Sequence, residues 1–124
     1  MALDDATRDF LAQAAAAGGP PLHEMTVEQA REMNAGLTPL YGTGPELASV
    51  QDVTLEANGS SFPVRVFRPD NAKGVFVYLH GGGWMLGTLD GFDTLCRQLA
   101  SRTGMTVVLA EYRKAPEHPF PAAL

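Results

Sequence analysis

The chain has 124 residues, of which 45% are hydrophobic and 19% are charged. This composition is typical of a globular protein, and the length allows one modest domain or a part of one. Because the formal net charge is -5 and no basic cluster could follow a phosphate backbone, we expect no nucleic-acid partner.

The cysteine content and the N-terminal residues favour a cytoplasmic protein. The single Cys96 cannot form an internal disulfide, and the acidic pair Asp4-Asp5 stands where a secretory signal would need basic and then apolar residues. The apolar run 75–79 is strand-sized, whereas spanning a bilayer takes about 18 to 20 residues. We therefore expect no membrane insertion.

Two short helices are predicted in the N-terminal part of the chain. Asp4 begins the first helix, which ends at the Gly-Gly-Pro sequence of 18–20. Thr26 and Gln29 form a capping-box pattern for the second helix, whose apolar residues recur at helical spacing. The prolines and glycines of 39–45 predict a linker.

A β-hairpin is predicted next. Apolar and polar residues alternate in 52–57 and again in 62–66, and Asn58-Gly59 between them is a strong signal for a tight turn. The alternation predicts that one face of the hairpin is exposed to water. Pro63 lacks a backbone donor, which suits an edge strand.

A strand, a helix and a second strand follow the hairpin. The run 75–79 is apolar without alternation, as expected for a central parallel strand that helices cover on both faces. Asp90 is predicted to cap a helix that ends at Gly104, and 105–110 is predicted to be another buried strand. This order predicts an α/β fold in which a mostly parallel sheet carries the antiparallel hairpin at one edge. The last residues, 121–124, predict the first turn of a further helix.

The segment 80–84 has the sequence His-Gly-Gly-Gly-Trp and leaves the predicted strand at its carboxyl end, where open α/β sheets bind ligands. Three interpretations are open: a sharp turn without chemistry, a phosphate cradle, and an oxyanion cradle in which a substrate approaches bare glycine amides. The phosphate cradle is the weakest, because Leu86 stands where a dinucleotide fingerprint has its third glycine and Gly87 comes one residue late. The complete HGGG pattern favours an oxyanion loop of the lipase and esterase type.

Together with the sequence EYRKAPEHPFPAAL at 111–124, this segment resembles the hormone-sensitive-lipase family of α/β-hydrolases, the bacterial family IV esterases. The resemblance implies the N-terminal portion of an α/β-hydrolase fold. In that portion, 1–45 is a helical cap segment with a linker, and 46–124 is a partial core that stops before the nucleophile elbow. Two departures stand out: Glu111 where the family more often has Asp, and Lys114 where it usually has an apolar residue.

The resemblance also implies a role for each residue of the glycine segment. Gly82 and Gly83 supply the amide donors of the oxyanion hole. His80 shapes the loop and is not the catalytic base, Gly81 belongs to the motif, and Trp84 lines the pocket or packs behind the loop.

No residue of this chain is predicted to be the catalytic nucleophile, acid or base. Only Ser61 among the serines has a glycine two residues before it, and Ser61 lies beside a hairpin turn. Cys96 falls on the apolar face of its helix, His118 lies in a proline-rich loop, and His23 is most simply a surface residue. Because no histidine or cysteine pair has metal-ligand spacing, we predict no metal and no cofactor.

Two functions of different classes remain open. The first is the N-terminal part of a serine carboxylesterase for short to medium acyl esters, which supplies the oxyanion loop and is inactive alone. Its partners are a small acyl ester and either the remaining C-terminal part of the hydrolase or a second copy of the chain. The second function is that of a non-catalytic remnant or interaction module that pairs through an exposed sheet edge.

Overall fold

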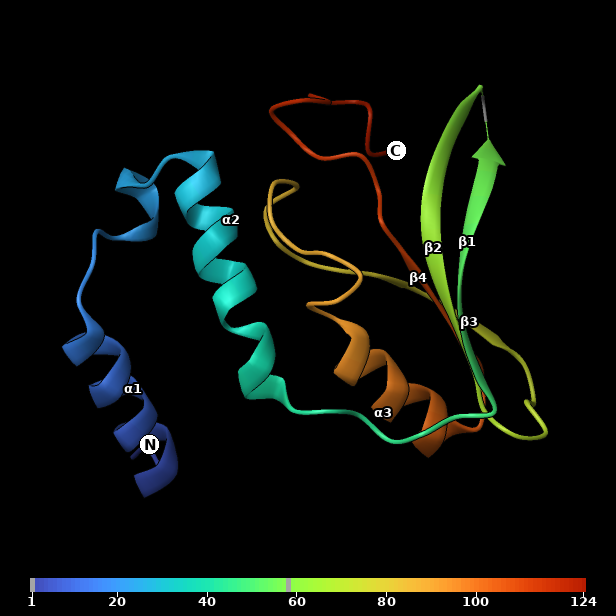
Figure 1. The fold of residues 1–124 in the computed structure, drawn as a ribbon, viewed down its shortest axis with the longest axis horizontal. Coiled ribbons are helices and arrows are strands. Elements are labelled where there is room, and N and C mark those ends of the chain that lie inside the picture. The colour runs from blue at the N-terminus through green and yellow to red at the C-terminus, as the bar shows by residue number, and fades with distance from the viewer. Residues whose placement is uncertain (1, 58) are drawn as a thin grey trace.

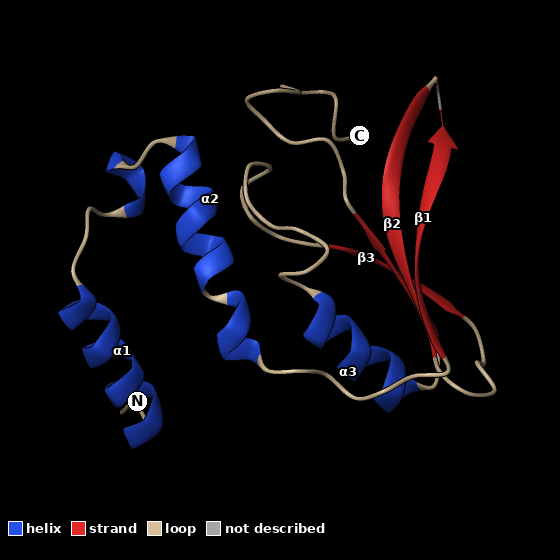
Figure 2. Ribbon diagram, in the orientation of Figure 1, coloured by secondary structure: helices blue, strands red, loops and turns tan. Residues whose placement is uncertain are grey.

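The computed structural model describes residues 2–57 and 59–124, which form one mixed sheet with helices placed to one side of it (Figures 1 and 2). The four strands lie in the order β1-β2-β4-β3. The elements, in chain order, are α1 (Asp5–Ala17), the 3-10 helix η1 (Leu22–Glu24), α2 (Val27–Gly36), the 3-10 helix η2 (Thr38–Tyr41), β1 (Ser49–Ala57), β2 (Ser60–Arg68), β3 (Val75–Leu79), α3 (Asp93–Thr103) and β4 (Thr106–Ala110).

The N-terminal helices begin where the sequence predicts. The Asp4 carboxylate caps α1 by accepting from the Thr7 amide at 2.9 Å, and both hydrogen bonds of the Thr26–Gln29 capping box of α2 are formed. The predicted linker is less irregular than expected, since η2 (Thr38–Tyr41) occupies its first part. No helix within the described residues is long and apolar enough to cross a bilayer.

Strands β1 and β2 form the predicted antiparallel hairpin over their whole length. Of the predicted turn Asn58-Gly59, Asn58 lies outside the described residues, and Gly59 has a φ of 72°. The prediction that Pro63 marks an edge strand is wrong, because β2 lies between β1 and β4. The Pro63 carbonyl accepts from the Glu111 amide at 3.0 Å, just beyond the end of β4. The N–H that proline lacks would face the same end of the β2–β4 ladder, so only one ladder hydrogen bond is lost.

Strands β3 and β4 are parallel and joined by α3, which confirms the predicted βαβ unit. The prediction that Asp90 caps this helix is wrong. The helix begins at Asp93 without a side-chain cap, because the Asp90 carboxylate instead accepts from Arg65 of β2 at 2.8 Å. The prediction of a new helix at 121–124 is not met either: this segment forms turns closed by i to i+3 hydrogen bonds.

The prediction that β3 is a central strand covered on both faces is wrong for this chain. β3 lies at the edge of the sheet, and α3 packs on the face that carries Tyr78. On the opposite face Val75, Val77 and Leu79 are 65%, 61% and 68% exposed, because none of the described helices covers it. The apolar face of the hairpin is open for the same reason, and Val53 is 41% exposed there.

The hydrophobic core lies between α3 and the sheet. Its fully buried members are Phe67 of β2, Cys96 and Ala100 of α3, and Val107 and Leu109 of β4. Burying one large apolar side chain contributes about 1.5 to 3 kcal/mol, so this cluster is the main source of cohesion between the helix and the strands. It fixes α3 against β2 and β4, and Tyr78 of β3 packs against it.

Cys96 gives a direct test of this core. Its side chain is 0% exposed, and burial raises the pKa of its thiol to about 12, so the thiolate that reacts with disulfide reagents is scarce in the native state. We expect Cys96 to react with a chromogenic disulfide only as fast as the chain unfolds, and at once in denaturant. Complete reaction within seconds under native conditions would contradict the packing described.

Candidate oxyanion site

The glycine segment folds into a tight turn directly after β3. Gly82, Gly83 and Trp84 have φ values of 133°, 61° and 56°. The Gly82 carbonyl accepts from the amides of Met85 at 3.1 Å and Leu86 at 2.8 Å. These bonds fold 82–86 back on itself at the end of the strand.

Gly82 can be replaced by no other residue without distortion. A Cβ atom at this position would lie 2.4 Å from the Leu86 carbonyl oxygen, and the φ of 133° is one that side chains disfavour. Gly81 differs on both counts, since a Cβ atom there would meet nothing within 4 Å and no positive φ is required. The close approach of Gly82 to Leu86 is therefore what makes the turn depend on glycine.

His80 is buried beneath the turn, with 4% exposure. Its ring is stacked between Phe92, at 5.0 Å between centroids, and Tyr112, at 4.4 Å. Its Nδ1 lies 2.8 Å from the Gly81 carbonyl oxygen, and the Tyr112 hydroxyl donates to the His80 carbonyl at 2.7 Å. This network assigns the proton to Nδ1, because a carbonyl oxygen only accepts.

The same surroundings bear on whether His80 acts as a base. Its Nε2 is buried and has no hydrogen-bond partner among the described residues, so the lone pair of this nitrogen faces protein and not solvent. A general base needs its nitrogen within reach of the proton that it removes. The geometry therefore supports the predicted role of His80 as a residue that shapes the loop.

The two predicted donors lie at an open pocket. Within residues 2–57 and 59–124, neither the Gly82 nor the Gly83 amide donates a hydrogen bond. A pocket of about 280 Å³ adjoins them, lined by Leu79, His80, Gly81, Gly82, Gly83, Trp84, Tyr112, Ala123 and Leu124. Trp84 lies at this pocket with 67% of its surface exposed. The arrangement offers free amides beside an apolar wall, as an oxyanion site requires.

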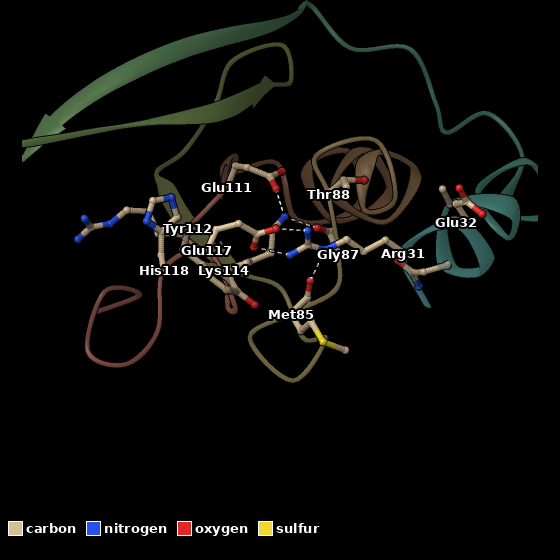
Figure 3. A pocket seen from close by; sticks show the side chains of 13 residues that line it. Arg31, Glu32, Met85, Gly87, Thr88, Glu111, Tyr112, Lys114, Glu117 and His118 are labelled. Atoms are coloured by element: carbon tan, nitrogen blue, oxygen red, sulfur yellow. Dashed lines mark hydrogen bonds and ion pairs between the residues drawn. The ribbon is translucent and has the colours of Figure 1, made fainter. Parts of the chain in front are cut away.

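The two positions that depart from the family pattern support the segment behind the turn. Glu111 accepts from the Leu89 amide at 2.7 Å, and Lys114 donates to the Gly87 carbonyl at 2.5 Å and forms an ion pair with Glu111 (Figure 3). Gly87 in turn lies against the His80 ring, since a Cβ atom at Gly87 would be 2.4 Å from Nδ1. The pair thus fixes the backbone on which the His80 ring rests.

Arg31 of α2 reaches the same region from the N-terminal part of the chain (Figure 3). Its guanidinium donates to the Met85 carbonyl at 3.2 Å and the Ala115 carbonyl at 3.0 Å. It also forms two bonds with the Glu117 carboxylate, at 2.6 and 2.8 Å. Sequence reasoning missed Arg31 and the stacking of Tyr112, because a contact over such a separation leaves no local pattern around either residue.

The remaining candidates do not gather at the glycine segment. Ser61 is exposed near the hairpin turn, opposite Glu56. Cys96 is in the core, and His118 is exposed in the loop after β4, where its amide donates to Lys114. His23 is exposed in η1. Within the described part of the chain, no three His, Cys, Asp or Glu side chains are grouped so as to hold a metal ion.

Comparisons with known proteins find mainly ester hydrolases. Residues 76–124 match the family model described as alpha/beta hydrolase fold. The chain is 36% identical to ethyl acetate hydrolase of Pseudomonas putida over 110 residues, which are 83% of this chain and 35% of that protein. It is 45% identical to the carboxylesterase NlhH of Mycobacterium tuberculosis over 85 residues, which are 64% of this chain and 26% of that protein.

Solved structures give the same result over nearly the whole chain. A thermostable esterase from Pseudomonas putida superposes with a TM-score of 0.84 at 33% identity, over 98% of this chain and 39% of that one. An esterase from Pyrobaculum calidifontis superposes with a TM-score of 0.83 at 36% identity, again over 98% and 39%. The chain thus spans well under half the length of these relatives, and the predicted fold class is confirmed.

Replacing Gly82 by alanine tests the turn. We expect Gly82→Ala to lower the free energy of unfolding by about 2 kcal/mol or more, because the new Cβ forces the Leu86 carbonyl away and strains the backbone. Gly81→Ala is the matched control and should change stability by less than about 0.5 kcal/mol. Equal effects of the two variants in urea unfolding would show that the turn is not as described.

Replacing Lys114 tests the support beneath His80. Lys114→Met leaves the largely buried Glu111 carboxylate without its cation, so we expect a loss of about 3 kcal/mol in urea unfolding. In Glu111→Gln/Lys114→Met the amide still accepts from Leu89 and no charge is stranded, so the double variant should be more stable than Lys114→Met. Lys73→Met, at an exposed lysine, is the control. A double variant no better than Lys114→Met would refute the coupling.

Proposed function

We propose the following function from the premise that this chain belongs to the hormone-sensitive-lipase family of α/β-hydrolases. Residues 80–84 are the oxyanion-binding loop of a serine carboxylesterase. The main support for the proposal is that the Gly82 and Gly83 amides donate no hydrogen bond within the described residues and lie beside a pocket at the carboxyl end of β3. Open α/β sheets bind their ligands at this edge.

The chemistry assigned to the loop is stabilisation of a tetrahedral intermediate. A serine oxygen attacks the ester carbonyl carbon, and the carbonyl oxygen becomes an oxyanion that the two amides receive. Removing one such donor typically lowers the rate about 100- to 1000-fold. Among residues 2–57 and 59–124, the candidates Ser61, Cys96 and His118 lie away from the loop. The proposal therefore takes the serine, its base and the acid that orients the base from further polypeptide of the hydrolase.

Short to medium acyl esters are the proposed substrates. The pocket beside the loop is small, at about 280 Å³, and the side chains of Leu79, Trp84 and Leu124 make its wall apolar. Such a wall suits an acyl chain, whereas the free amides suit the carbonyl oxygen. The relatives named for ethyl acetate and carboxylic ester hydrolysis fit the same substrate class. The proposed mechanism uses no cofactor, and a cytoplasmic setting suits the reduced Cys96 thiol.

A second candidate function is protein interaction without catalysis. The open apolar face of the sheet carries a groove of about 470 Å³ that includes Leu55, Phe62, Val77 and Leu79, and β3 has a neighbour on one side only. A free strand edge pairs readily with another chain. Under the first proposal the remainder of the hydrolase covers these surfaces, whereas under the second a partner or a second copy does so.

Hydrolysis of a nitrophenyl butyrate separates the two functions. We expect residues 1–124 alone to be inactive, and we expect turnover that a serine-directed inhibitor abolishes once the downstream polypeptide of the same gene is supplied. Ser61→Ala is the matched control and should leave that turnover unchanged. Inhibitor-sensitive turnover by pure 1–124 would contradict the proposal, and a monodisperse folded chain that stays inactive with the downstream polypeptide would favour the interaction module.

A further inference from the structure

Arg31 is the contact through which α2 reaches the turn that carries the glycine amides. It donates to Met85 in that turn, to Ala115 in the loop after β4, and to Glu117 two residues further on. In Figure 3 its side chain extends from α2 into the space between these segments. One guanidinium therefore joins three parts of the chain that are distant in sequence.

We propose that Arg31 is a positioning residue for the oxyanion loop, holding Met85 and Ala115 so that the 82–86 turn keeps one conformation. The inference rests on the proposed function of that loop. It adds a residue from the N-terminal segment, in which the sequence and the comparisons assign no site residue.

The hydrogen bonds give a short path from Arg31 to the glycines. The Met85 carbonyl is bound by Arg31, and the Met85 amide donates to the Gly82 carbonyl at 3.1 Å. The Ala115 carbonyl is bound by Arg31, and the Ala115 amide donates to the Trp84 carbonyl at 2.9 Å. Both residues whose carbonyls accept from Arg31 therefore also bind the turn through their own amides, and β3 holds the other end of the turn.

The ion pair with Glu117 cannot by itself account for this arrangement. The Arg31 and Glu117 side chains are 35% and 53% exposed, and pairs this open to solvent contribute little to stability. The bond with Arg31 lowers the pKa of Glu117 to about 2, so the carboxylate stays charged and holds the guanidinium plane in place. The part specific to arginine is the donation to two carbonyls, which a carboxylate cannot provide and a single ammonium cannot span.

This difference suggests a charge-reversal experiment. The variants are Arg31→Met, Arg31→Lys and the swapped pair Arg31→Glu/Glu117→Arg, with Arg8→Met as control, because Arg8 pairs with Asp5 on the exposed surface of α1. Each is made in the assembly of 1–124 with the downstream polypeptide. The measurements are kcat and KM on nitrophenyl butyrate and hydrogen exchange at the Leu86 and Ala115 amides, whose acceptors lie in the turn.

We expect Arg31→Met to lower kcat about 10- to 100-fold, because a small displacement of oriented groups has effects of this size, and to speed exchange at both amides about tenfold or more. Arg31→Lys should show the same changes more weakly, and Arg8→Met should show neither. The swapped pair should not recover, since its carboxylate at position 31 faces two carbonyl oxygens.

Two results would overturn the inference. Recovery of both kcat and amide protection in the swapped pair would reduce Arg31 to one half of a structural ion pair. Unchanged exchange in Arg31→Met would show that Arg31 does not hold the turn, whatever the activity. If the unaltered assembly hydrolyses no ester, the proposed function fails, while the exchange measurement still decides whether Arg31 orders the turn.

Discussion

The parallel pairing of β3 with β4 is the constraint on which the rest of the site depends. The register runs from Val75 opposite Thr106 to Leu79 opposite Ala110, so both strands end at the same edge of the sheet. The segments that continue from them, 80–84 and 111–117, are consequently neighbours. An antiparallel pairing would send them to opposite ends of the sheet, and none of the contacts around His80 could form.

From this shared edge the glycine turn is supported on several sides. Tyr112 and Phe92 enclose the His80 ring, and the Glu111–Lys114 pair holds the backbone next to that ring. Arg31 holds the far side of the turn. The turn needs such support because positive φ values and an unpaired pair of amides are unfavourable in isolation. A preorganised oxyanion site depends on this kind of rigidity, since donors that must first be ordered lose part of their effect.

Local physical rules in the sequence predict most of the fold. The capping box at Thr26, the alternation in the hairpin and the mostly apolar run of β4 each determine structure within a few residues, and each is found as predicted. The failures involve partners from elsewhere. Asp90 does not cap α3 because Arg65, from a strand 25 residues earlier, binds its carboxylate. Likewise, the apolar sequence of β3 indicates that both faces of the strand can be buried. It does not indicate whether another element covers each face.

The same distinction holds for the candidate site. The segment 80–84 could be identified from the sequence, because its consecutive residues are themselves the motif. Arg31 and Tyr112 could not be identified, since their importance depends on contacts across 54 and 32 residues of chain. Apart from the sign of its charge, nothing local separates Arg31 from Glu28 and Glu32 of α2. The residues that form the turn are thus encoded locally, whereas those that support it become visible only in three dimensions.

The central claim is that the Gly82 and Gly83 amides receive a developing oxyanion. It is tested most directly by recording the amide proton resonances of Gly81, Gly82 and Gly83 in the assembly that carries the nucleophilic serine, before and after a phosphonate ester forms its covalent adduct. If these amides receive the oxyanion, the Gly82 and Gly83 protons move to lower field and exchange more slowly, while the Gly81 proton changes little. An adduct that forms fully and leaves the Gly82 and Gly83 resonances unmoved would contradict it.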